Sequence, residues 1–157
     1  MANPTKASSR IALNTRLIAL TFSIFFLTIN LRQELFSQKI VLLQLILAIP
    51  LLLTSTLAYS KVSYRERTNR WEILSWITFV LGYSFLLNIV GILVGNIAGV
   101  LLATIFFVAS WILTLTYSLI DISYNKSVIK ERLVKDGIFI LIQLTFGLLV
   151  VLKLINF

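Results

Sequence analysis

The sequence contains no cysteine and no histidine, and only two prolines and six glycines among its 157 residues. Without cysteine the chain has no disulfide and no thiol nucleophile, and without histidine it lacks the commonest catalytic base. The usual ligands of zinc and haem are missing as well. The low proline and glycine content excludes collagen-like and disordered chains. We therefore expect no enzyme activity, no catalytic residue, no metal and no cofactor.

Charged residues are also scarce, at 13% of the chain, whereas hydrophobic residues make up 59%. Soluble domains carry about 25% charged and about 45–50% apolar residues. A globule of this size has too little interior to hide so much apolar surface from water. The composition therefore predicts that lipid is the main solvent of this chain.

Five stretches have the length of about 20 mainly apolar residues that a membrane-spanning helix needs. Their apolar runs are continuous rather than alternating, and they exceed the strands of a membrane barrel, which have about 9–11 residues. We predict an all-α, polytopic integral membrane protein with five transmembrane helices in a single bundle, and one domain over residues 1–157. The stretches cover residues 11–31, 40–60, 72–94, 97–120 and 137–155.

The first stretch is the least regular, because Asn14 and Arg16 interrupt it. Arg16 can extend its guanidinium to the membrane surface. Four spanning helices plus one interfacial N-terminal helix are therefore the alternative architecture. A basic start before an apolar centre also fits a cleaved signal peptide, but no small-residue cleavage site follows it.

Basic residues are distributed unevenly between the two sides of such a bundle. If the five stretches alternate in direction, eleven of the 14 Lys and Arg residues fall on the side of the N-terminus. Short loops rich in Lys and Arg stay in the cytoplasm. We therefore expect a protein of the cytoplasmic membrane, with the N-terminus inside and the C-terminus on the opposite side.

The fourth stretch carries small and hydroxyl side chains on one helical face and ends on an acid. In an oligomer this face could line a pore, and as a packing seam its small residues would let helices approach closely. Phe106 and Phe107 flank the same face and would either narrow a pore or fill a core. The candidate pore-lining or helix-packing positions are Gly99, Ala103, Ser110, Thr114, Ser118 and Asp121.

Amides and glycines in the other stretches are candidate packing positions, because an amide inside a membrane is costly unless it is paired. Glycines repeat every four residues at GILVGNIAG, which is typical of a helix dimer or of a tight hairpin, and we place the hairpin turn at Gly95–Asn96. We expect Asn88 toward the outer leaflet and Gln143 toward the inner one. The packing candidates are Gly91, Gly95, Asn88, Gln143 and Gln44.

Two further patterns concern the first and second stretches. Asn14, Thr21 and Thr28 recur every seven residues and form a narrow polar stripe, for which we expect packing between helices. Pro50 removes a backbone donor near the middle of the second stretch and predicts a kink.

The two basic loops on the N-terminal side are candidate docking surfaces. Anionic lipid headgroups attract each base near the membrane surface by about 1 kcal/mol. An acidic cytosolic protein is the more specific partner, whereas no recognition motif points to nucleic acid. The candidate docking residues are Arg65, Arg67, Arg70, Lys130 and Arg132.

Together these patterns favour a non-enzymatic, self-associating multi-pass membrane protein that forms a channel-like or pore-like homo-oligomer for ions or small solutes. The alternative is a sensor or anchor subunit, of a signalling, stress or defence type, that docks a cytosolic partner through the basic loops. A dimeric carrier of small solutes is a third hypothesis. The stretches carry no charge at their centres, which argues against a proton-driven transporter.

Overall fold

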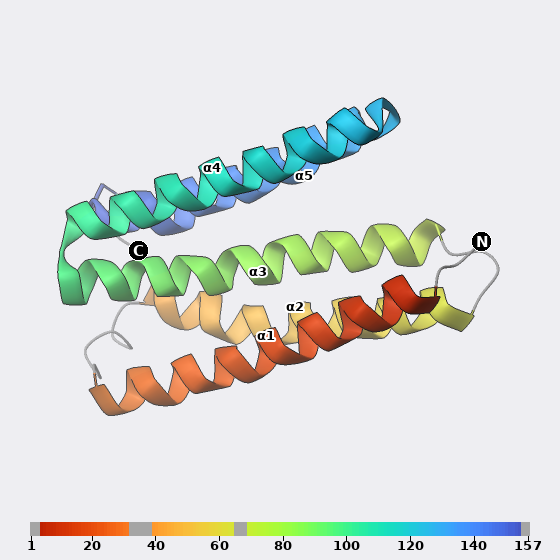
Figure 1. Cartoon of the computed structure of the whole chain (residues 1–157). Coiled ribbons are helices and arrows are strands. Elements are labelled where there is room, and N and C mark those ends of the chain that lie inside the picture. The colour runs from red at the N-terminus through yellow and green to blue at the C-terminus, as the bar shows by residue number, and fades with distance from the viewer. Residues whose placement is uncertain (1–3, 32–38, 65–68, 155–157) are drawn as a thin grey trace. The chain divides into compact units, whose positions relative to one another are not determined.

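The computed structural model describes residues 4–31, 39–64 and 69–154 (Figure 1). These residues are almost entirely helical, as the continuous apolar runs predict. The long helices are α1 (Pro4–Leu31), α2 (Lys39–Tyr64), α3 (Asn69–Ala98), α4 (Val100–Tyr124) and α5 (Ile129–Gln143). A 3-10 turn, η2 (Lys126–Val128), precedes α5, and a π-helical turn, η3 (Leu144–Leu148), joins α5 to the short α6 (Leu149–Val151).

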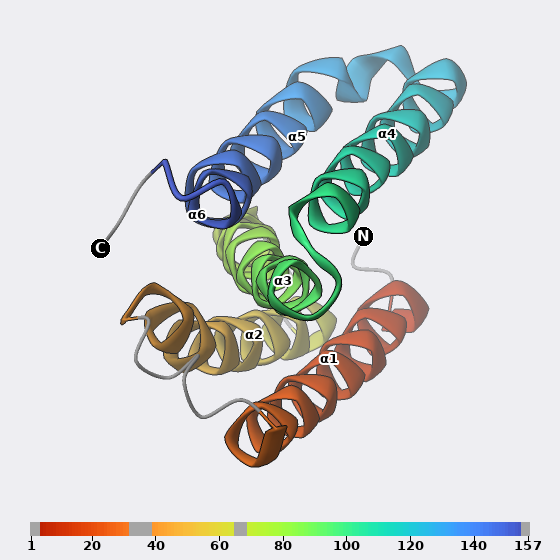
Figure 2. The ribbon, with the colours of Figure 1, turned by 90° about the vertical axis from the view of Figure 1, so that its left-hand side faces the viewer.

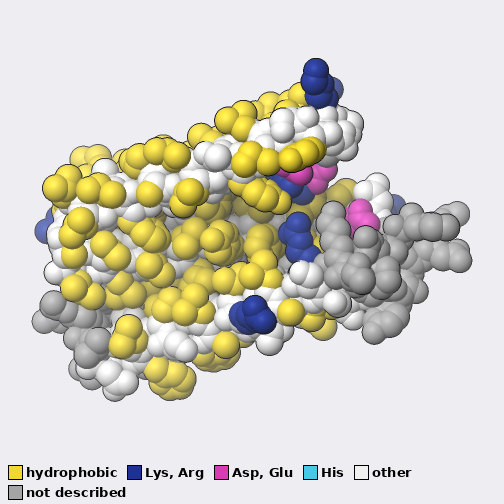
Figure 3. Space-filling model, in the orientation of Figure 1, with side chains coloured by type: hydrophobic (Ala, Val, Ile, Leu, Met, Phe, Trp, Pro, Cys, Tyr) yellow, Lys and Arg dark blue, Asp and Glu magenta, His cyan; other side chains and the backbone are white. Residues whose placement is uncertain are grey.

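Five helical segments are long and apolar enough to cross a membrane, which confirms the five stretches seen in the sequence. Large apolar side chains lie exposed along them, such as Leu101 at 74% and Leu113 at 70%. Figure 3 shows hydrophobic side chains spread over the visible face of the described residues. The five segments are Ser8–Thr28, Lys39–Val62, Asn69–Ala98, Val100–Tyr124 and Ile129–Val151.

Two helix ends differ from the sequence prediction. The last segment begins at Ile129 rather than at residue 137, because Glu131 in the first turn and its i,i+4 partner Lys135 support a helical extension. The turn predicted at Gly95–Asn96 is wrong, since α3 continues to Ala98. The chain reverses at Gly99 instead, where φ is 95° and ψ is 163°. Glycine alone adopts this conformation readily.

The chain divides into two compact units, residues 1–86 and residues 87–157, which we call unit 1 and unit 2. The first part of α3 belongs to unit 1 and the remainder, from Leu87, belongs to unit 2. That residues 1–157 form a single bundle and a single domain stays a prediction.

In unit 1, α1 and α2 run antiparallel side by side (Figures 1 and 2). Arg10 donates to the hydroxyl of Tyr59 at 3.4 Å, and Asn14 Nδ2 donates to Ser55 Oγ at 2.9 Å. The second pair lies one turn further along each helix, in opposite directions, so a single register satisfies both. Ser55 in turn donates to the main-chain carbonyl of Ser75 at 2.8 Å, which ties α3 to the pair.

The polar stripe of α1 faces into unit 1, as its seven-residue spacing predicts. Asn14 and Thr21 are fully buried, and Thr28 is almost so. The two threonine hydroxyls donate to carbonyls four residues back in α1, which satisfies them without a partner helix. Gln44 of α2 is also buried. Polar side chains therefore contribute a large share of the packed surface of α1.

In unit 2, α4 and α5 lie side by side and antiparallel (Figures 1 and 2). Asn125 ends α4, and its Oδ1 accepts hydrogen bonds from the backbone N–H and the hydroxyl of Ser127. This turn reverses the chain within a few residues. It therefore brings the end of α4 directly against the start of α5.

Replacing Gly99 by alanine is expected to destabilise the protein by about 1–3 kcal/mol, because its backbone conformation is almost exclusive to glycine. A Cβ at Gly99 would meet no atom within 4 Å, so the cost is conformational alone. Gly137→Ala is the matched control, since a Cβ there also meets nothing, but the residue lies in regular helix. This control substitution should raise the stability of the protein by about 0.5–1 kcal/mol. Thermal unfolding in detergent measures the stability of both variants. Equal shifts of the two thermal midpoints would contradict a special backbone conformation at Gly99.

Candidate functional site

The polar face predicted on α4 is its packing face within unit 2. Ala103 and Phe107 are completely buried and Ser118 is 3% exposed. Ser110, Thr114 and Asp121 on the same face are partly buried, whereas Gly99 lies apart, exposed in the turn. The sequence allowed this face to be either a pore lining or a packing seam. The described residues show packing contacts along it.

Two polar pairs fix how α4 lies against α5. Arg132 Nε donates to Asp121 Oδ2 at 2.6 Å, and Ser110 Oγ lies 3.4 Å from Gln143 Oε1, to which it donates. Each pair is separated from the other by eleven residues in both helices, about three helical turns or 16 Å. The same antiparallel register therefore satisfies an ion pair at one end and an amide contact near the middle.

The side chain of Phe107 occupies a space left by two glycines. A Cβ built at Gly91 of α3 would lie 2.7 Å from Phe107 Cε2, and a Cβ built at Gly147 of η3 would lie 2.7 Å from Cε1. Gly95 similarly faces Ala103 and Val151. The Gly91 and Gly95 positions of the repeat thus serve contacts within the chain. This supports the hairpin interpretation of the motif.

Asn88 and Gln143 lie close to the same level of unit 2. Asn88 Nδ2 donates to the carbonyl of Ile142 at 3.3 Å, and Ile142 directly precedes Gln143. The two amides therefore lie at neighbouring levels of unit 2, whereas the sequence predicted that they lie toward different leaflets and do not meet. That prediction counted depth from the helix ends, and the last helix begins eight residues earlier than expected.

The interior of unit 2 also holds polar atoms that have no hydrogen-bond partner among the described residues. They are Gln143 Nε2, Trp111 Nε1 and Ser118 Oγ, all within α4 and α5. Buried atoms of this kind are commonly satisfied by an ordered water. Among the described residues, the contacts that this arrangement shows are packing and hydrogen bonding.

At the start of α5, Asp121 and Tyr117 hold the guanidinium of Arg132. The carboxylate also lies 2.5 Å from an Nη atom, and the guanidinium carbon stands 4.9 Å from the centre of the tyrosine ring. The sequence predicted Asp121 as a pore-lining or packing residue and Arg132 as a docking residue. The structure brings them together as an intramolecular ion pair.

The remaining candidate docking residues differ in their placement. Arg70 at the start of α3 and Lys130 at the start of α5 are exposed. Lys61 and Lys126, which were not among the candidates, are exposed as well. Arg65 and Arg67 lie outside the described residues. Lys135 pairs with Glu131, so Lys126 and Lys130 are the bases near the start of α5 without an ion pair among the described residues.

Sequence reasoning missed several buried polar residues. Asp136 is 8% exposed and shares a face of α5 with Phe139 and Gln143, at spacings of three and four residues. That spacing was visible in the sequence, but the helix was predicted to start after Asp136. Ser55 and Ser75 of unit 1 were also missed, because nothing in a single stretch indicates which hydroxyl another helix will meet.

We expect Gly91→Ala to destabilise the protein by about 1–3 kcal/mol, because the added methyl group overlaps the ring of Phe107. In a Phe107→Leu background the same substitution should cost less, since the smaller side chain frees the space. Unfolding in detergent for the four proteins of this double-mutant cycle measures the coupling. An equal cost of Gly91→Ala in both backgrounds would show that the glycine is needed for another reason.

The pair formed by Asp121 and Arg132 should show a coupling free energy of about 1 kcal/mol. We expect Asp121→Asn and Arg132→Gln each to lower the thermal midpoint, and the double variant to cost less than the sum of the two. Glu131→Gln is the control, because it removes the neighbouring exposed pair with Lys135. Additive effects of Asp121→Asn and Arg132→Gln would indicate that the two side chains act independently.

Comparison with known proteins reveals no relative of this chain. No protein-family model, no curated protein and no solved structure matches it.

Proposed function

We propose that this chain is a non-enzymatic, multi-pass membrane subunit that anchors a cytosolic partner protein through the bases at the cytoplasmic ends of its helices. The observation that carries the proposal is the set of exposed bases left once the ion pairs of Arg132 and Lys135 are formed. Arg70 and Lys130 belong to this set, together with Lys61 and Lys126.

A membrane location is supported by the five long apolar helices and by the exposed leucines along them. In water such surfaces would associate, whereas lipid tails accept them. The loops on the N-terminal side carry most of the positive charge, which favours a cytoplasmic N-terminus in the cytoplasmic membrane. Under this orientation the exposed bases face the cytosol and the anionic headgroups of the inner leaflet.

The channel-like homo-oligomer receives less support from the geometry. A pore lining has to be open to solvent, but Ala103, Phe107 and Ser118 of the predicted lining face are buried within unit 2. Ser110 and Asp121 are engaged with α5. We therefore rank the anchor hypothesis above the pore, with self-association as the competing outcome.

The test is purification of the full chain from its native host in nanodiscs, followed by measurement of the mass and composition of the particles. We expect a soluble protein at fixed stoichiometry, and we expect Arg70→Glu combined with Lys130→Glu to release it. Charge reversal removes attraction to an acidic surface and adds repulsion. Lys39→Glu is the matched control, because Lys39 is an exposed base at the start of α2, on the side that we predict to lie outside the cytoplasm.

Three results separate the hypotheses. Loss of the soluble protein in the double reversal but not in Lys39→Glu supports anchoring. Retention of the protein in nanodiscs of neutral lipid shows that it contacts the chain rather than anionic headgroups. A symmetric particle that contains this chain alone would overturn the proposal and favour the homo-oligomer, for which ion flux into liposomes is the direct assay.

A further inference from the structure

A buried acid lies inside the last of the five apolar segments. Among the described acids only Asp136 is buried, at 8% exposed, whereas Asp121 is partly exposed and Glu72 and Glu131 are exposed. Asp136 lies seven residues, or about 10 Å, beyond Ile129, where this segment begins. An ionisable side chain within a membrane-spanning helix is costly, and by default it marks a site where a charged group is bound.

The charge of Asp136 is not compensated by the contacts of the described residues. Among them its carboxylate has no hydrogen bond and no ion pair. The two nearest bases along α5 are already engaged, because Arg132 pairs with Asp121 and Lys135 pairs with Glu131. A carboxylate in apolar surroundings is expensive unless its charge is neutralised and its oxygens are bonded.

Ser118 of α4 is a second buried polar side chain at the same level. It is 3% exposed, and its Oγ has no hydrogen-bond partner among the described residues. In the register that the two polar pairs of α4 and α5 fix, Ser118 lies within one residue of the level of Asp136. One register therefore brings two buried polar groups to the same level from two helices, and the two are not bonded to each other.

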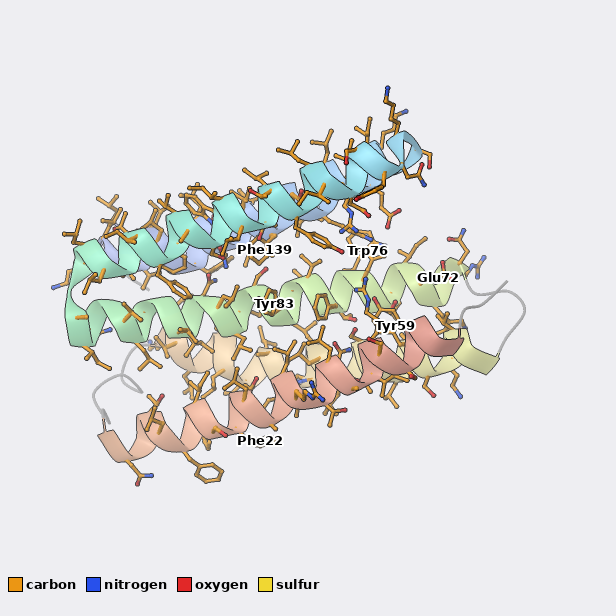
Figure 4. All side chains as sticks on the ribbon, viewed as in Figure 1. Phe22, Tyr59, Glu72, Trp76, Tyr83 and Phe139 are labelled. Carbon is orange, nitrogen blue, oxygen red and sulfur yellow. The ribbon has the colours of Figure 1, made fainter. Side chains whose placement is uncertain are left out.

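Both side chains lie on the packing faces of their helices. Ser118 follows the buried Phe107 by eleven residues, or about three turns of α4. Asp136 precedes Gln143, which contacts α4, by seven residues or about two turns of α5. Phe139, labelled in Figure 4, is buried on the same face of α5 between these two residues. The carboxylate thus has an apolar neighbour in the next turn of its helix.

The chemistry of the two groups selects the kind of ligand that satisfies both. A proton alone neutralises Asp136 but leaves the hydroxyl of Ser118 without a partner, and a water alone leaves the charge. A monovalent cation does both, because carboxylate and hydroxyl oxygens are ligands of hard cations. A divalent cation is matched less well, since no group of three or more Asp, Glu, His or Cys lies together among the described residues.

We propose that Asp136 and Ser118 bind one monovalent alkali cation, Na⁺ or K⁺, between α4 and α5. The cation neutralises the carboxylate, accepts a lone pair of the hydroxyl and completes its coordination with water. It adds a polar contact between the two helices, in the interval between the two pairs that set their register. The site lies inside unit 2 and is independent of the basic surface proposed to bind a partner.

The test compares the full chain in nanodiscs of neutral lipid in sodium, potassium and choline chloride at one ionic strength. Equal ionic strength keeps the screening of surface charges constant. We expect Na⁺ or K⁺ to raise the thermal midpoint by about 2–4 °C over choline, because a ligand of the folded state stabilises it. Retention of radioactive sodium, with potassium and choline as competitors, measures binding directly and shows which cation is preferred.

Substitutions at the two side chains test the site itself. Asp136→Asn should abolish the effect of the cation without lowering the midpoint in choline, because it removes an uncompensated charge and keeps the shape. Ser118→Ala should weaken cation binding about tenfold, since one bond to a charged group is lost. Ser123→Ala is the matched control and should change nothing, because Ser123 is an exposed hydroxyl of α4 that donates to its own helix.

Three results would overturn the proposal. The first is equal midpoints in the three salts with no retained sodium. The second is a midpoint that depends on pH but not on the cation and loses this dependence in Asp136→Asn, which would assign the neutralising charge to a proton. The third is a cation effect that persists in both Asp136→Asn and Ser118→Ala, which would place the cation elsewhere.

Discussion

The structure depends on the constraint that a polar group inside apolar surroundings needs a partner. In unit 1 the amide of Asn14, the hydroxyl of Ser55 and the carbonyl of Ser75 form one chain of hydrogen bonds across three helices. In unit 2 the pairs of Asp121 with Arg132 and of Ser110 with Gln143 set the register of α4 and α5. Apolar contacts alone permit many helix positions, whereas directional pairs select few.

Close packing takes over where polar pairs are absent. Lipid tails are as apolar as leucine, so membrane helices gain little from burying leucine against leucine, and fit becomes more important. The ring of Phe107 fits against two helices because Gly91 and Gly147 have no side chains. The same ring that would narrow a pore thus fills a core. Of the two roles that the sequence allowed for Phe107, narrowing a pore or filling a core, the contacts of the described residues show the second.

The polar groups most relevant to function are those that stay exposed and make no ion pair within the described residues. Arg132 does not belong to these groups, because it forms an ion pair with Asp121 and lies over the ring of Tyr117. Lys130, only two residues away, stays exposed. On α1, Asn14 joins two helices, whereas Arg16 is exposed and has no hydrogen bond or ion pair among the described residues. Exposed bases such as Lys130 are the groups on which the proposed docking of a cytosolic partner rests.

The sequence by itself determined the helical class, the five apolar segments and the inward stripe of α1, because length, continuity and periodicity are local properties. It misplaced the turn between α3 and α4, because three glycines at a spacing of four leave open which of them reverses the chain. It also misplaced the start of α5, because a charged loop and a charged helical extension have the same composition. Tertiary structure decided which polar residues meet. The partners of Asn14, Asp121 and Gln143 lie 41, 11 and 33 residues away in the chain, and no local pattern encodes which helix a side chain will face.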